Sequence, residues 1–124
     1  MSNTQVMEIG KKLVEMCRAG KPHEAMAALY AKDIVSMEAG APPGQQREAK
    51  GLAACEAKGK MFFEMHEIHG QSVEGPFPHD DRFAVYFDYD ITNKQNKQRF
   101  HMKEVALYWV KDGKIVREEF YYGM

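Results

Sequence analysis

The chain has 124 residues, which suffice for one domain, residues 1–124, but not for two independent hydrophobic cores. Its 17 Lys and Arg residues nearly balance its 18 Asp and Glu residues, and no basic run stands out, so we expect no nucleic-acid partner. No apolar run approaches the ~20 residues of a membrane-spanning helix, and residues 1–12 lack the apolar core of a signal peptide, so we expect a soluble, cytoplasmic chain without a membrane partner.

Helical patterns dominate the first half of the chain. Residues 3–19 place apolar side chains at helical spacing, and HEAMAALYA, residues 23–31, predicts a second, shorter helix. DIVSME, residues 33–38, predicts a short strand. Residues 39–50, which contain Pro and Gly, are expected to form a loop without regular structure, and residues 51–64 return to a helical pattern.

The second half of the chain changes to strand patterns. Strand-like runs at residues 66–75, 82–92, 98–110 and 114–122 are separated by turn sequences rich in Gly, Pro, Asn and Asp. Helices followed by an antiparallel meander predict an α+β fold in which helices cover one face of a curved sheet. The alternating residues of the second run that should meet the helices are Phe83, Val85, Phe87, Tyr89 and Ile91.

The third strand-like run contains a carboxylate within an apolar pattern. Alternation places Met102, Glu104, Ala106, Tyr108 and Val110 on one face, and His101, Lys103, Val105, Leu107 and Trp109 on the other. Both faces are apolar towards Trp109, so the strand should lie between two apolar environments. Glu104 then either enters a cavity or pairs with a charged neighbour.

Cysteine and histidine residues give no metal signature. Cys17 and Cys55 lack the spacing of a metal site or of a disulfide framework, and we expect both to be small buried apolar side chains. His66, His69 and His101 are dispersed along the chain. We therefore predict no metal site and no cofactor.

Two motifs resemble those of a known family. LYAKDIVSME, residues 29–38, joins a helix end to a first strand, and VKDGKIVREEFYY, residues 110–122, forms a terminal hairpin with a DGKI turn. Together with the order of elements, they make essentially the whole chain similar to the SnoaL-like domains of the nuclear-transport-factor-two-like superfamily, which includes ketosteroid isomerase. The resemblance implies a cone-shaped curved antiparallel sheet wrapped around N-terminal helices, one open apolar pocket, and dimerisation through the outer face of the sheet.

The similarity to ketosteroid isomerase also implies functional positions. Glu38 falls on the position of the general base, a role that a partly desolvated glutamate can fill, unless it is simply solvated at the strand end. The two donors of the isomerase's oxyanion hole fall near Leu13 and Ala106, neither of which can donate a side-chain hydrogen bond. Ketosteroid isomerisation by the known mechanism is therefore not expected.

The same resemblance turns further side chains into the pocket. On the last strand the inward set is Val116, Glu118, Phe120 and Tyr122. For Glu118, a solvated or cross-strand-paired position is the favoured interpretation in so charged a strand. His66 is a candidate proton relay to Glu38 or Glu104, or else an ordinary junction histidine bonded to backbone. The residues expected to contact a ligand are Met61, Phe87, Met102, Tyr108, Glu118 and Tyr122.

Two functions fit these patterns. The first is a small cofactor-free pocket enzyme of isomerase, lyase or cyclase type, which uses carboxylate acid–base chemistry on an apolar carbonyl-containing molecule, with Glu38, Glu104 and His66 as catalytic candidates. The alternative, favoured by the unmatched oxyanion residues, is a non-catalytic module that binds a hydrophobic small molecule or serves dimerisation. A homodimer is also expected, because the strand face of His101, Val105, Leu107 and Trp109, joined by Ala84 and Tyr86, is too apolar to remain exposed.

Overall fold

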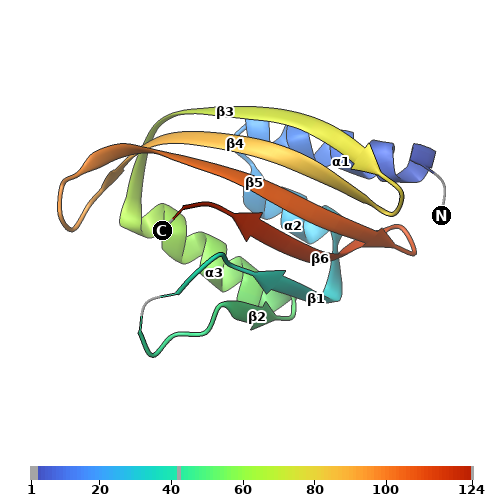
Figure 1. Ribbon diagram of the computed structural model, residues 1–124, viewed down its shortest axis with the longest axis horizontal. Coiled ribbons are helices and arrows are strands. Elements are labelled where there is room, and N and C mark those ends of the chain that lie inside the picture. Colours follow the sequence, from blue (N-terminus) through green and yellow to red (C-terminus); the bar gives the residue numbers. More distant parts are fainter. Residues whose placement is uncertain (1–2, 42, 124) are drawn as a thin grey trace.

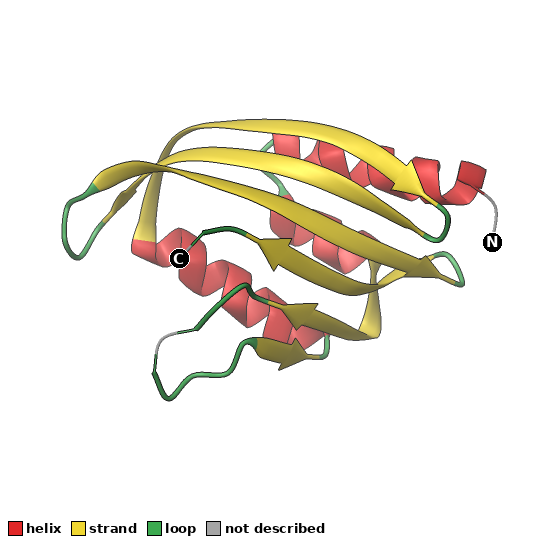
Figure 2. Ribbon diagram, viewed as in Figure 1, coloured by secondary structure: helices red, strands yellow, loops and turns green. Residues whose placement is uncertain are grey.

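In the described part of the chain, three helices lie along one side of a curved six-stranded sheet (Figure 1, Figure 2). The computed structural model describes residues 3–41 and 43–123. In chain order the elements are α1 (Asn3–Arg18), α2 (Pro22–Leu29), β1 (Tyr30–Met37), β2 (Glu48–Lys50), α3 (Leu52–Met65), β3 (His66–His79), β4 (Arg82–Asn93), β5 (Arg99–Lys111) and β6 (Lys114–Tyr121). The expected α+β class is confirmed. Among the described residues, no helix is long and apolar enough to cross a membrane.

The strands follow the order β2-β1-β6-β5-β4-β3. Strands β3 to β6 form the expected antiparallel meander, but β1 and β6 are parallel neighbours. The expectation of a wholly antiparallel sheet is wrong at this pair, because turn sequences reveal which consecutive strands form hairpins and not which strand the first one joins. The parallel pair places the first and last strands side by side.

Two element boundaries differ from the sequence prediction. Helix α2 ends at Leu29, and Tyr30 has extended backbone angles, so β1 begins inside the segment expected to be helical. Glu48–Lys50 pair with β1, although residues 39–50 were expected to lack regular structure. A strand of 3 residues is too short to show a periodicity. Residue 42 of that expected loop lies outside the described residues.

The apolar face of β4 packs beneath the helices, as predicted. Its buried side chains are Phe83, Val85, Phe87, Tyr89 and Ile91. Across the β4–β5 pair, Phe87 lies opposite Glu104 and Phe83 lies opposite Tyr108. Glu104 and Tyr108 therefore share the inner face of the sheet with the buried side chains of β4.

The pairing of β5 with β6 contains a register shift just before Val110. Ile115 is fully buried, whereas Val116 is only half-buried, so the expected inward position of Val116 is wrong. A shift of one residue moves a side chain to the other face of a sheet, and the sequence did not mark this irregularity. Beyond the shift, Glu118 and Phe120 point inward, as the resemblance implies.

Gly10 marks a close approach between α1 and β3. An added Cβ would stand 2.7 Å from Cβ of Pro76 and 3.3 Å from Cδ2 of Phe83. We expect Gly10→Ala to lower the free energy of unfolding by about 1–3 kcal/mol through overpacking, even though alanine is otherwise the better helix former. Urea denaturation measures the change.

Gly59→Ala in α3 is the matched control. Its added Cβ would meet the flexible end of Met26, with Cε at 3.1 Å, which can move aside. This variant should be neutral or more stable than the original chain. Equal stabilisation by the two substitutions would contradict the close packing of α1 on β3.

Candidate active site

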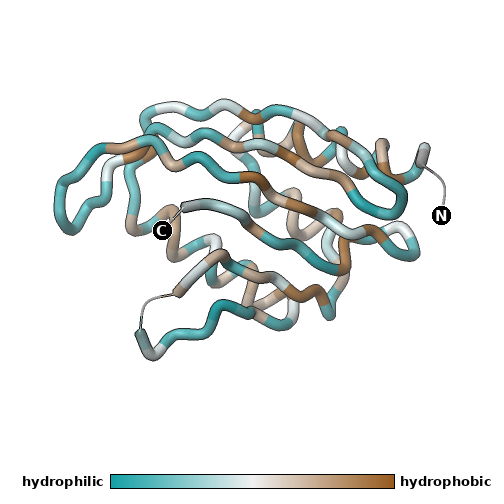
Figure 3. Tube along the Cα trace, in the orientation of Figure 1, coloured by the Kyte–Doolittle hydropathy of each residue, from teal (hydrophilic) through white to brown (hydrophobic). Residues whose placement is uncertain are grey.

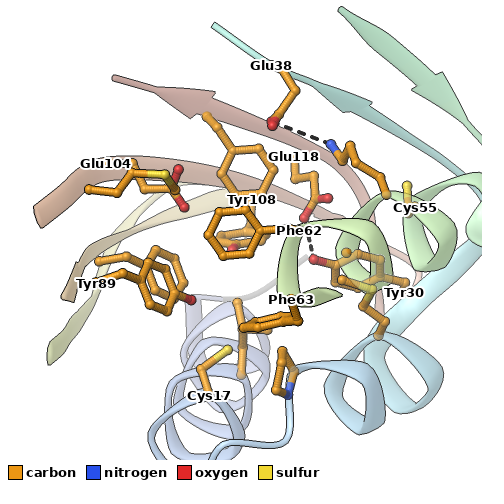
Figure 4. A pocket seen from close by; sticks show the side chains of 18 residues that line it. Cys17, Tyr30, Glu38, Cys55, Phe62, Phe63, Tyr89, Glu104, Tyr108 and Glu118 are labelled. Carbon is orange, nitrogen blue, oxygen red and sulfur yellow. Dashed lines mark hydrogen bonds and ion pairs between the residues drawn. The ribbon is translucent and has the colours of Figure 1, made fainter. Parts of the chain in front are cut away.

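A cavity of about 120 Å³ opens between the helices and the inner face of the sheet (Figure 4). Its walls are mostly apolar, with Phe62 and Phe63 from α3 and Phe87 from β4. The polar side chains that interrupt this lining include Tyr30, Glu38, Lys58, Glu104, Tyr108 and Glu118. An apolar cleft with a few convergent polar groups is the usual form of a small-molecule site.

Glu118 is the most buried of the cavity carboxylates, with an exposed fraction of 1%. Its carboxylate accepts a hydrogen bond from the Tyr30 hydroxyl and another from the Ser36 hydroxyl, the latter at 2.8 Å. Burial raises the pKa of Glu118, whereas these hydroxyls and the charge of Lys58 favour its ionised form. The parallel β1–β6 pair makes this possible, because it sets Ser36 directly opposite Glu118.

Lys58 connects Glu118 to a second carboxylate. Its ammonium group donates to Oγ of Ser36, lies 3.5 Å from Oε2 of Glu38, and stands 5.1 Å from the centroid of the Phe120 ring. The Ser36 hydroxyl therefore accepts from Lys58 and donates to Glu118. One polar chain thus runs from Glu38 through Lys58 and Ser36 to Glu118.

Among the described residues, no hydrogen bond of the kind that stabilises Glu118 reaches Glu104. It is buried, and its carboxyl group makes no hydrogen bond to any residue in the described part of the chain. Burial raises the pKa of Glu104 to about 8, the negative charges of Glu38 and Glu118 add to the rise, and Lys58 opposes it. Near neutral pH Glu104 is therefore mainly protonated.

Two tyrosine hydroxyls that line the cavity also have no hydrogen-bond partner among the described residues. Neither Tyr89 nor Tyr108 makes a side-chain hydrogen bond within residues 3–41 and 43–123. Burial raises the pKa of both phenols, and the charge of Glu118 raises that of Tyr108 further, so both stay protonated and can donate. Stacking fixes their rings, with 5.0 Å between the centroids of Tyr108 and Phe83 and 5.8 Å between those of Tyr89 and Phe87.

The two cysteines line the same cavity as protonated thiols. Burial raises the pKa of Cys17 to about 12 and that of Cys55 to about 11. Neither is therefore a ready nucleophile near neutral pH, and both add apolar surface. The described residues contain no group of three or more His, Cys, Asp or Glu side chains suited to a metal ion.

The structure brings most of the sequence-predicted site residues into this one cavity. Those that line it are Glu38, Phe87, Met102, Glu104, Tyr108 and Glu118. The favoured expectation that Glu118 is solvated or paired across the strands is wrong, because Tyr30 and Ser36 supply buried donors that a charge-rich strand does not reveal. Glu38 is not simply solvated either, since its side chain is 30% exposed and faces Lys58.

Three predicted residues are absent from the lining of the cavity. Met61 is 60% exposed, because adjacent helical residues point about 100° apart and Phe62 takes the inward position. Nδ1 of His66 lies 2.9 Å from the backbone oxygen of Phe62, which is the ordinary arrangement of a junction histidine, and the residue does not line the cavity. Tyr122 follows the end of β6 and does not line the cavity, but it lies near it, since burial and the charges of Glu38 and Glu104 raise the pKa of its phenol.

Tyr30, Ser36 and Lys58 were not among the residues predicted to form the site. Ser36 lies two strand residues before Glu38, so alternation could have placed both on one face. Lys58 interrupts the apolar side of α3, and an ammonium group at such a position was a usable signal. Tyr30 gave none, because the helical pattern of the preceding residues runs through it.

Comparisons with known proteins agree with this architecture. Residues 2–122 match the SnoaL-like domain family. A Mesorhizobium loti protein described as a candidate SnoaL-like polyketide cyclase is 40% identical, with a TM-score of 0.89 over 98% of this chain and 100% of that one. A candidate isomerase from Bacillus subtilis is 17% identical, with a TM-score of 0.77 over 99% of this chain and 90% of its own, a likeness that shows the fold alone. No match is found among curated proteins.

The titration of Glu104 tests the electrostatics of the cavity. Carbon NMR of the glutamate side chains should show a Glu104 midpoint near pH 8. Glu38→Gln removes a negative charge and should lower this midpoint by roughly one pH unit, whereas Lys58→Met removes the opposing cation and should raise it by a similar amount. Glu74→Gln, which neutralises an exposed glutamate outside the cavity, is the control. If neither cavity substitution changes the Glu104 midpoint, the proposed effect of the Glu38 and Lys58 charges on Glu104 is contradicted.

Proposed function

Because this chain belongs to the SnoaL-like family, and because its cavity holds a protonated carboxyl group and an ion-paired carboxylate together, we propose that it is an enzyme of isomerase, lyase or cyclase type. It moves a proton on an apolar molecule that carries a carbonyl group, and the scheme needs no cofactor. The observation that carries this proposal is the contrast between Glu104 and Glu38. Two carboxyl groups in different protonation states can act as acid and base on one substrate.

In this scheme Glu38 is the general base. Its carboxylate faces the cavity beside Lys58. It takes a proton from the carbon next to the carbonyl group, the carbon–hydrogen bond breaks, and the electron pair moves onto the carbonyl oxygen to give an enolate. Return of the proton to a different carbon, loss of a neighbouring group, or attack on a second carbonyl then gives an isomerase, a lyase or a cyclase outcome.

Glu104 and Tyr108 donate hydrogen bonds to the carbonyl oxygen of the substrate. Both lie on the inner face of β5, both carry a proton, and neither has a hydrogen-bond partner in the described chain. Donors placed where charge develops usually supply the largest part of catalysis. Tyr108 lies two residues beyond Ala106, so it offers a hydroxyl on the same strand face where the oxyanion position of ketosteroid isomerase falls on alanine.

Exchange of α-protons of simple ketones in deuterated water tests the chemistry without knowledge of the natural substrate. Glu38→Gln and Glu104→Gln should each lower the catalysed exchange by roughly a hundredfold, and Tyr108→Phe by a similar factor. The rate should fall above about pH 8, because burial raises the pKa of Glu104 to about 8 and the acid is lost above it.

Glu74→Gln should leave this exchange unchanged, because Glu74 is an exposed glutamate outside the cavity. If no ketone exchanges faster with the protein than without it, the enzymatic proposal fails. Ketone binding without exchange would then favour the alternative, a non-catalytic module for a hydrophobic small molecule.

The outer face of the sheet supports a second element of the proposal, a homodimer. Val105 and Tyr121 face each other across β5 and β6 and are 39% and 47% exposed, and Leu107 lies opposite Ala84 on the next strand. Figure 3 shows hydrophobic residues along the central part of β5. A second copy that covers this face would remove its apolar side chains from water.

Sedimentation measures the assembly. We expect a dimer at micromolar concentration and a shift towards monomer in Val105→Lys, because a lysine in the centre of the face would be buried without a partner. Met61→Lys is the matched control, since Met61 is exposed on α3, away from this face. A monomer at every concentration would contradict the dimer.

A further inference from the structure

We infer that the natural ligand is a small, uncharged carbonyl compound of about one ring, and that the cavity rejects carboxylates and fused-ring molecules. The inference rests on the proposed function for the carbonyl group alone. Size and charge follow from the cavity itself.

The volume of the cavity limits the size of the ligand. It measures about 120 Å³ and is open to solvent, whereas a closed apolar protein cavity of about 150 Å³ holds one benzene molecule, so one ring fills the cavity and a small substituent can extend into its mouth. Stacking holds two of the aromatic side chains in its wall. Tyr108 is stacked on Phe83 and Tyr89 on Phe87, and close-packed interiors resist the shifts that a larger ligand would require.

The charges of the cavity select against anions. Glu38, Glu104 and Glu118 line it, and the described lining contains no arginine and no histidine. The ammonium group of Lys58 is already engaged with Ser36 and Glu38. A ligand carboxylate would therefore lose its water beside buried negative charge without gaining a free cation.

The free hydrogen-bond donors of the cavity favour a ligand that carries an acceptor. Tyr89, Tyr108 and protonated Glu104 are donors that have no acceptor among the described residues. Their polar atoms are not among the fully enclosed, unpartnered atoms of the described chain and line the cavity, so a ligand oxygen that accepts from them is favoured. A carbonyl oxygen has lone pairs for two of these donors and carries no charge.

Three commercial compounds separate these features. Acetophenone and benzoate have the same number of heavy atoms and differ in charge, whereas fluorenone is a neutral ketone with fused rings. Methyl NMR of methionine reports where each one binds, because Met26 and Met102 line the cavity and Met61 and Met65 lie exposed on α3. At pH 7 acetophenone should shift the Met26 and Met102 signals, with a dissociation constant of roughly a millimolar for so small a ligand.

Benzoate should bind at least tenfold more weakly than acetophenone, and fluorenone should leave the Met26 and Met102 signals unchanged. In Glu38→Gln, which frees Lys58 from its carboxylate, the affinity for benzoate should rise by tenfold or more. Equal or tighter binding of benzoate by the original chain would overturn the charge argument, and fluorenone binding in the cavity would overturn the size argument. Failure of all three to bind would overturn the inference as a whole. These experiments measure binding, so their outcome does not depend on proton exchange, which tests the enzymatic proposal.

Discussion

A carboxylate that leaves water for an apolar interior needs hydrogen bonds or a cation to stabilise its charge. Glu118 needs them most, because it is the most buried glutamate of the cavity. The hydroxyls of Tyr30 and Ser36 meet this requirement directly, and Lys58 meets it through Ser36. Several features of the fold follow from this compensation. Tyr30 has to begin β1, Ser36 has to lie opposite Glu118, and α3 has to run close enough for Lys58 to reach Ser36. The buried network therefore holds the first strand, the last strand and the third helix in one arrangement.

Glu104 shows what happens when the same requirement is not met. It lies on β5, next to the strand that carries Glu118, and it faces the same cavity. No described hydroxyl or amide is directed at its carboxyl group, so the neutral form is favoured. Burial thus raises the pKa of both glutamates on these neighbouring strands, but within the described chain only Glu118 has hydroxyl donors and the nearby hydrogen-bonded lysine that oppose the rise directly. In the proposed function, the protonated carboxyl group of Glu104 acts as the acid beside the carboxylate of Glu38.

Local periodicity accounts for the part of the site that the sequence could predict. Alternation along β4 and β5 shows which side chains share the inner face, and it identified Glu104 as a carboxylate in an apolar environment. The hydrogen bonds that stabilise Glu118 could not be predicted from the sequence, because they join residues separated by 88 and 82 positions in the chain. Periodicity carries no information about such pairs. The register shift before Val110 was hidden for a related reason, since it depends on how two strands align and not on either one alone.

The polar groups of the cavity are distributed unevenly, and in the proposed function this asymmetry orients the ligand. Helices α1 and α2 contribute Leu13, Cys17, Pro22 and Met26, which offer no strong donor or acceptor at neutral pH. The hydroxyls, the carboxyl groups and the ammonium group come from the sheet, from Glu38 just after β1, and from α3. Leu13 of the first helix offers no side-chain donor, so in the proposed function the donors of β5 act from the opposite side. In that proposal the apolar body of the ligand packs towards α1 and α2, and its carbonyl oxygen points towards β5.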